Sequence, residues 1–187
     1  MQWLRKFSAD QILTMGDAVA VAEELVSNAY KMSAAQWLRN RYDVRTVADL
    51  DVDEVADRPL AQIIRYRGQL PDSSLGSAAY DFYKICLQDH NILGALDDSP
   101  DLRLFPCALY IMCHELIHIV RFARFLQRFE ATDEERLAEE GRVHEKTRAI
   151  LKGVRVPGME AVLESYGDWT EPMDTRRAVY QAHQLLA

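Results

Sequence analysis

The 187 residues are enough for one domain with a sizeable core and too few for two ordinary domains, so we expect a single domain over residues 1–187. Apolar residues make up 49% of the chain and charged residues 27%, near the averages of folded proteins, which excludes wholesale disorder. The net charge of −7 argues against nucleic acid as a partner, because such binding depends on clustered Lys and Arg.

The first ten residues contain no apolar stretch long enough for a secretory signal, and no later segment approaches the roughly 20 apolar residues that span a bilayer. We therefore expect a cytoplasmic protein without a membrane span. The cysteines Cys86, Cys107 and Cys113 are odd in number and match no zinc-knuckle or redox spacing. They are expected to be buried free thiols.

Two helices are expected at the start of the chain. Ser8 and Gln11 form a capping-box pattern, and apolar residues at helical spacing then continue the first helix to about Lys31. Ser33 is expected to cap a short second helix.

The segment over residues 43–71 is interrupted by proline and glycine, so it predicts only short pieces, with one short strand between Arg45 and Asp51. A further helix is expected over residues 75–93, ending before Gly94. Its expected apolar face consists of Leu75, Ala79, Phe82, Cys86 and Leu93.

The longest predicted helix begins near Phe105, with a proline in its first turn, and extends to about Phe129. Thr132 and Glu135 form a second capping box, which begins a helix that ends near Lys152. The short turn between these two helices predicts a helix hairpin.

Two more helical segments are expected over residues 157–166 and 172–186. The predicted fold class is mainly α: a single-domain helical bundle with the longest helix in a helix hairpin, and little or no β-sheet.

The middle of the longest helix contains the pentad His114-Glu115-Leu-Ile-His118, an H-E-x-x-H motif. Residues four apart lie one turn apart on nearly the same helix face, so the two histidines can present ring nitrogens to one metal ion. Glu115 lies beside them and can accept a proton from water. The surrounding residues are uncharged, and buried imidazole and carboxylate groups need partners, which a metal ion would supply.

The second helix of the hairpin offers two candidates for a third ligand. Glu140 and His144 fall in the middle of an apolar face that consists of Leu137, Val143, Ile150 and Leu151. Either residue could complete a site with three protein ligands, and we favour Glu140. His144 and Asp89, a carboxylate on the face of the 75–93 segment, are candidates for a group that orients a ligand or replaces one.

The pentad, followed one hairpin later by Glu140-Gly-Arg-Val-His144, resembles the gluzincin branch of the zincin metallopeptidases over about residues 110–145. The resemblance implies zinc ligands His114, His118 and Glu140, Glu115 as general base, and His144 as a support for a ligand histidine. Zincins also carry a β-sheet before the pentad, whose edge strand holds the peptide substrate. The sequence predicts no such sheet here.

Three functions follow as hypotheses for this helical metal-binding domain. The first is a zinc-dependent, metallopeptidase-like hydrolase of an unspecified small-molecule or peptide substrate. The second is a non-haem di-iron or di-manganese carboxylate protein, because Glu115-Leu-Ile-His118 is also a Glu-x-x-His pair, although the matching second pair is missing. The third is a metal-free helical interaction module. A homo-oligomer is compatible with all three.

Overall fold

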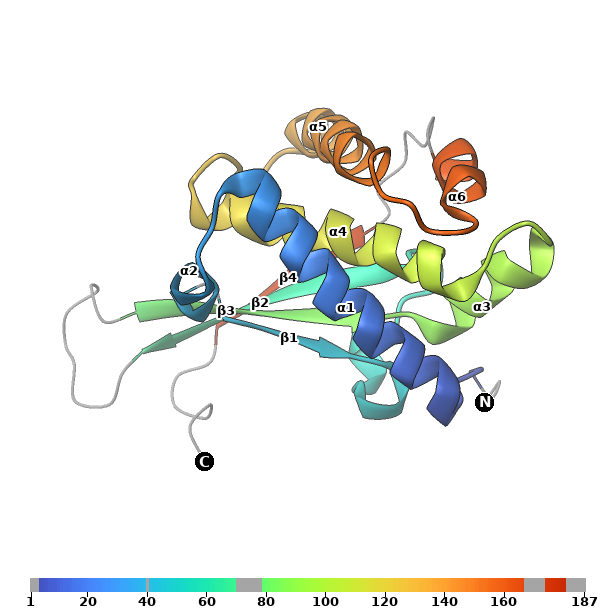
Figure 1. The fold of residues 1–187 in the computed structure, drawn as a ribbon. Helices are drawn as coiled ribbons and strands as arrows, with labels where there is room; N and C mark the ends of the chain where they lie inside the picture. Colours follow the sequence, from blue (N-terminus) through green and yellow to red (C-terminus); the bar gives the residue numbers. More distant parts are fainter. Residues whose placement is uncertain (1–3, 40, 70–78, 167–173, 181–187) are drawn as a thin grey trace.

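The protein combines helices with a four-stranded sheet. Figure 1 shows how these elements are arranged. The structure is a computed structural model and describes residues 4–39, 41–69, 79–166 and 174–180. The described helices are α1 Ala9–Tyr30, α2 Ala34–Arg39, α3 Asp89–Asp98, α4 Leu104–Ala123, α5 Asp133–Leu151 and α6 Met159–Tyr166. The strands are β1 Tyr42–Arg45, β2 Ala61–Gln69, β3 Ala79–Leu87 and β4 Asp174–Tyr180. The expectation of a mainly α bundle with little or no sheet is therefore wrong, and the fold is mixed α/β.

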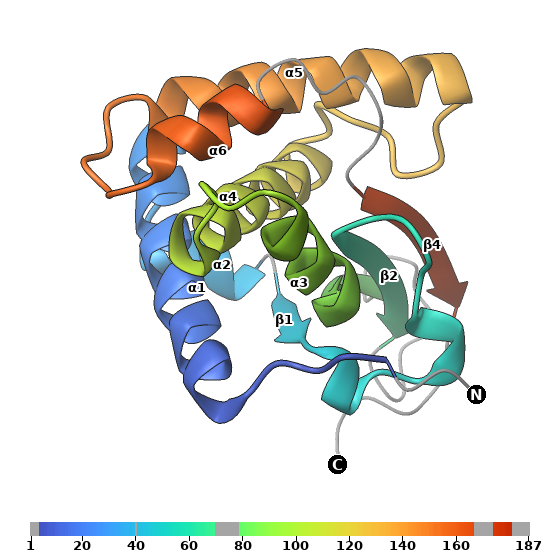
Figure 2. The same cartoon turned by 90° about the vertical axis from the view of Figure 1, so that its right-hand side faces the viewer.

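The strand order in the sheet is β1-β3-β2-β4. Strands β2 and β3 pair antiparallel, while β1 pairs parallel to β3 and β4 pairs parallel to β2. Ile63 and Ile85 are register partners in the middle of the sheet, and both are fully buried in the core shared with the helices. Figure 2 shows α4 between the sheet and the pair α5 and α6, with α1 alongside.

The segment expected as a helix over residues 75–93 instead contains β3 and the start of α3, while residues 75–78 lie outside the described residues. Phe82 and Cys86, which were placed on one helix face, are four residues apart, and that spacing puts side chains on one face of a strand as well. Ile85 and Cys86 are neighbours on opposite faces of β3, and both are fully buried. The strand therefore lacks the apolar-polar alternation that would have identified it.

Two other expectations on strands are also wrong. The range 172–186 was expected to be helical, but β4 occupies its described part, where the backbone pairs with β2. The short strand expected between Arg45 and Asp51 lies slightly earlier, as β1, and short 3₁₀ helices follow it at Val47–Asp49 and Val52–Glu54. In both places, pairing with distant strands decides the local structure.

Helix α4 is the centre of the core. Every residue from Pro106 to Val120 is buried, and neighbours of the helix include α1, α5, α6 and β2. By length and composition alone α4 could cross a membrane, but 83% of its apolar window is buried inside the protein, as in a core helix. The two expected capping boxes, Ser8 with Gln11 and Thr132 with Glu135, are confirmed at the starts of α1 and α5.

A buried ion pair links the 3₁₀ region to the sheet. Lys84 Nζ lies 2.6 and 2.7 Å from the two carboxylate oxygens of Glu54, and the Tyr66 hydroxyl donates to the same carboxylate at 3.0 Å. Burial raises the pKa of Glu54, but these donors and the Asp51 backbone amide outweigh it and hold the pKa below its ordinary value of 4.5. The pair therefore depends on the charge of Glu54.

Replacing Glu54 by Gln is expected to lower the free energy of unfolding by about 2 to 4 kcal/mol at neutral pH, because the Lys84 ammonium loses its buried partner. Since the folded pKa lies below the unfolded one, this contribution is present above pH 4.5 and is lost as the pH falls through the folded pKa. Urea unfolding at several pH values measures both effects. The double change Glu54→Gln with Lys84→Met should recover part of the loss, and an equal loss in both variants would contradict the argument.

Candidate metal centre

His114 and His118 lie one turn apart on α4, with ring centroids 4.7 Å apart. Their Nε2 atoms are 3.0 Å apart, and both side chains are fully buried. The i, i+4 spacing on a regular helix fixes this arrangement, because each side chain projects from the same face. Two basic nitrogens so close in a buried place need a shared partner.

Glu140 supplies that partner from α5. One carboxylate oxygen lies 3.1 Å from His114 Nε2, and the other lies 3.2 Å from His118 Nε2. Burial raises the pKa of Glu140, but the charge of His118 and hydrogen bonds from both histidines outweigh it and hold the pKa far below its ordinary range. Glu140 is therefore a carboxylate, the form that binds metal. The hairpin brings together the three residues that the sequence predicted as ligands.

The spacing of these atoms fits a zinc ion. One candidate ligand atom from each of His114, His118 and Glu140 lies within 4.8 Å of the other two. Among the described residues, these three form the group of His, Cys, Asp or Glu side chains that could hold a metal ion. In tetrahedral zinc sites with bonds of about 2.0 to 2.1 Å, neighbouring ligand atoms are about 3.3 Å apart. The two Nε2 atoms are 3.0 Å apart, which is close to that value. The two oxygens of the Glu140 carboxylate each lie near one of these nitrogens, at 3.1 and 3.2 Å. Two imidazoles and a carboxylate also form a donor set that catalytic zinc uses.

Glu115, the predicted general base, follows His114 on α4 and is only 1% exposed. The same helix therefore holds it next to the first histidine of the candidate centre. Its carboxylate is thus shielded from solvent, as the side chains of the two histidines are.

The sequence did not predict a role for Gln127, whose amide oxygen lies 3.1 Å from His118 Nδ1. Helix α4 was expected to continue to about Phe129, but it ends at Ala123. Phe125 then adopts a left-handed conformation with φ 55°, and Leu126 donates back to the Arg121 carbonyl. This turn brings Gln127 back to His118. No glycine marks it, so the sequence held no clear signal.

His144 lies beside the centre, but its recorded hydrogen bond goes to Tyr110. The Tyr110 hydroxyl is 2.8 Å from His144 Nδ1, and the ring centroids of His144 and His114 are 4.5 Å apart. Burial and the neighbouring charge of His114 lower the pKa of His144 from 6.5 to about 4, so its ring is neutral at pH 7. Tyr110 could have been noticed in the sequence, because it precedes His114 by four residues on the same helix face.

Asp89, the other predicted alternative ligand, is not brought to the centre. Its carboxylate accepts hydrogen bonds from the backbone amides of Phe7 and Val47, at 2.9 and 3.1 Å. These contacts tie the N-terminal segment and the first 3₁₀ helix to the start of α3. Asp89 is fully buried for a structural reason.

Comparison of the chain with protein-family models, with curated proteins and with solved structures finds no match. The function of the centre therefore has to be inferred from its own residues and geometry.

Proposed function

We propose that the protein is a mononuclear zinc-dependent hydrolase that acts on an amide or ester bond, with His114, His118 and Glu140 as the metal ligands. The observation that carries the proposal is a buried cluster: two Nε2 atoms lie 3.0 Å apart, and each lies 3.1 or 3.2 Å from a different oxygen of the Glu140 carboxylate. Burial of two imidazoles and a carboxylate in the core is costly, and a metal ion bound by all three would compensate for that cost.

Each residue has a distinct role in the proposed reaction. A zinc ion held by the three ligands would lower the pKa of a coordinated water and polarise a carbonyl group. Glu115 accepts the proton of the attacking water and passes it to the leaving group, as a positioned general base does. Gln127 accepts a hydrogen bond from His118 Nδ1, so Nε2 is the ring nitrogen that would bind the metal in place of its proton.

A sheet is one feature of zincins that the sequence did not predict and that the fold contains. The strands β1, β2 and β3 precede the H-E-x-x-H helix in the chain, and β4 follows it. Of the described strands, β1 and β4 lie at the edges of the sheet. An edge strand offers unpaired backbone groups to an extended peptide, so a peptide is one class of substrate that this fold could hold.

The dinuclear iron or manganese alternative receives less support from the geometry. Such centres are built from carboxylates on several helices that bridge two ions. Among the described residues, the cluster that could hold a metal contains one carboxylate, from Glu140. One ion is therefore favoured over two.

Metal analysis of protein purified without an affinity tag tests the proposal. One zinc per chain is the expected result, and it should be released by a chelator and restored by adding Zn²⁺. Two iron or manganese ions per chain would support the dinuclear alternative instead. A protein that binds none of these metals would support the metal-free interaction module and overturn the proposal.

Replacing Gln127 by Leu is expected to weaken zinc binding by about 10- to 100-fold, because His118 loses the partner that fixes its tautomer. Replacing it by Glu keeps an acceptor at the same place, so zinc affinity should stay near or above that of the wild type. Competition with a zinc chelator of known affinity measures both values. Equal weakening in the two variants would show that Gln127 acts through packing alone.

A further inference from the structure

The tautomer of His144 follows from its contact with Tyr110. The Tyr110 side chain is fully buried, and its recorded hydrogen bond is the one of 2.8 Å to His144 Nδ1. If the hydroxyl instead accepted a hydrogen bond from an Nδ1–H group, its own O–H donor would be buried without a partner, which is costly. Tyr110 therefore donates to Nδ1, and the neutral ring carries its proton on Nε2.

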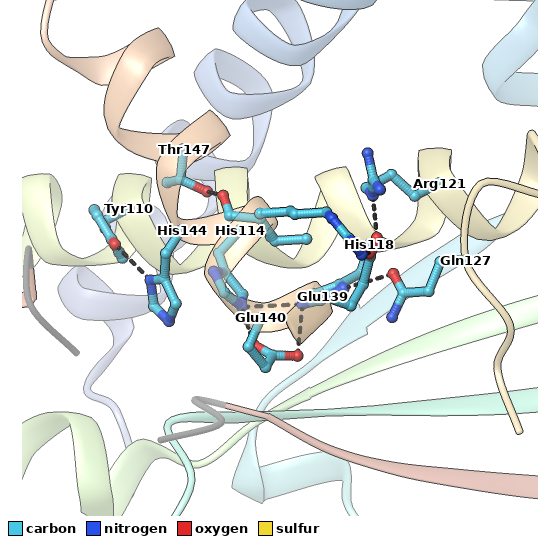
Figure 3. Close-up of polar contacts among 11 residues, drawn as sticks. Tyr110, His114, His118, Arg121, Gln127, Glu139, Glu140, His144 and Thr147 are labelled. Atoms are coloured by element: carbon cyan, nitrogen blue, oxygen red, sulfur yellow. Dashed lines mark hydrogen bonds and ion pairs between the residues drawn. The ribbon is translucent and has the colours of Figure 1, made fainter. Parts of the chain in front are cut away.

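The Nε2–H group of His144 is a buried donor that no other described group satisfies. The side chain is only 4% exposed. Figure 3 shows the rings of His144, His114 and His118 in a row, with the Glu140 carboxylate on one side of it. The second ring nitrogen of His144 is directed to that same side. A donor placed beside a metal centre, with nothing to donate to, fits a ligand that the centre has yet to receive.

We propose that His144 Nε2–H donates a hydrogen bond to an oxygen atom of the molecule bound at the metal centre, and that Tyr110 is the positioning residue that fixes this tautomer. The inference rests on the proposed function. The ligand class is a carbonyl compound or an oxyanion, such as a carboxylate, a hydroxamate or the tetrahedral anion of amide or ester hydrolysis. A fixed neutral donor stabilises charge that develops on oxygen, because it needs no rearrangement at the moment of reaction.

This role differs from the one that the resemblance to gluzincins implies. There, the residue four positions after the ligand glutamate supports a ligand histidine. Here, the hydrogen bond of His144 goes to Tyr110, and its ring lies 4.5 Å from that of His114 without a recorded hydrogen bond between them. His144 is also outside the group of ligand atoms that lie within 4.8 Å of one another. The geometry thus separates His144 from the ligands and from their support.

Binding of acetohydroxamate to the zinc-loaded protein tests the donor role. His144→Phe keeps the size of the side chain and removes Nε2–H, so hydroxamate affinity should fall by about 10- to 100-fold. Zinc affinity should change less than about threefold, since His144 is not a ligand. Tyr110→Phe removes the hydroxyl with little change of shape and should give a smaller loss of hydroxamate affinity. Calorimetric titration measures the hydroxamate affinity, and chelator competition measures the zinc affinity.

A second measurement needs neither zinc nor hydroxamate. Nitrogen-15 NMR of the histidine rings in the metal-free protein should show the Nε2–H tautomer of His144 in the wild type. In Tyr110→Phe the same ring should show a mixture of both tautomers, because nothing donates to Nδ1. A purely structural contact between the two rings would leave the tautomer unchanged.

The outcomes are distinguishable. A wild-type protein that binds no zinc overturns the proposed metal centre, and this inference with it. Zinc binding with equal hydroxamate affinity in wild type and His144→Phe overturns the donor role alone. A loss of zinc from His144→Phe as large as that from a ligand variant would make His144 a ligand. The Nδ1–H tautomer in the wild type would contradict the role given to Tyr110.

Discussion

Replacing His118 by Ala is expected to abolish stoichiometric zinc binding while most of the helical content remains. The change removes one of three ligand atoms. Zinc affinity should therefore fall by more than the factor of about 100 that loss of a hydrogen-bond partner of a ligand can cost. The fold should survive because α4 packs through a continuous apolar surface, of which His118 is one buried position among many. Metal analysis after dialysis, together with far-UV circular dichroism, measures the two effects.

His90→Ala is the control, because it also removes a histidine, here a half-buried one, that lies outside the centre. His90 Nε2 contacts the Ala56 carbonyl at 3.2 Å, so its loss should affect local packing and leave one zinc per chain. If His118→Ala retained zinc at wild-type stoichiometry, His118 would not be a ligand. If both variants lost zinc equally, the effect would come from destabilisation.

The candidate centre could be predicted because its parts are local. A helix places His114 and His118 on one face by spacing alone, and the Thr132 capping box marks the start of the helix that carries Glu140. The apolar face around Glu140 was only partly correct. Val143 and Leu151 are buried as expected, but Leu137 is 54% exposed.

The sheet could not be predicted from the sequence because its pairings are distant and its central strands are buried on both faces. Ile63 and Ile64 are neighbours in β2, point to opposite faces, and are both fully buried. Apolar and polar residues therefore do not alternate along this part of β2, and alternation is the pattern by which a strand is recognised in a sequence. Strand β4 pairs with β2 across more than a hundred residues of sequence, and no local propensity encodes that contact.

The surroundings of the ligands were missed for a related reason. Gln127 reaches His118 only because α4 ends early and Phe125 takes a left-handed conformation that non-glycine residues rarely adopt. A helix that continued to about Phe129 would have carried Gln127 away from His118. Predicting that Gln127 contacts a metal ligand would thus have required knowing the residue at which α4 ends. Helix ends are the part of a helix that a sequence pattern defines least well.

Replacing Glu115 by Gln is expected to leave one zinc per chain and to lower hydrolytic kcat by about 100- to 10,000-fold. The amide keeps the shape of the side chain but cannot accept a proton from water, so only the general-base step is lost. The substrate is undefined, so the assay is a mixture of quenched fluorescent peptides and nitrophenyl esters, first screened with the zinc-loaded wild type. The measurement pairs kcat on any cleaved probe with metal content of the same preparation.

Glu160→Gln is the control for this change, because it makes the same replacement on an exposed residue of α6 and should alter neither kcat nor zinc content. Loss of zinc from Glu115→Gln would make Glu115 a ligand, and the Glu-x-x-His interpretation with a dinuclear centre would then gain support. Retained zinc with unchanged kcat would remove Glu115 from the mechanism. The zinc-loaded wild type could also cleave no probe while His118→Ala still loses its zinc. That result would support the assignment of the metal ligands and contradict the proposed hydrolase activity.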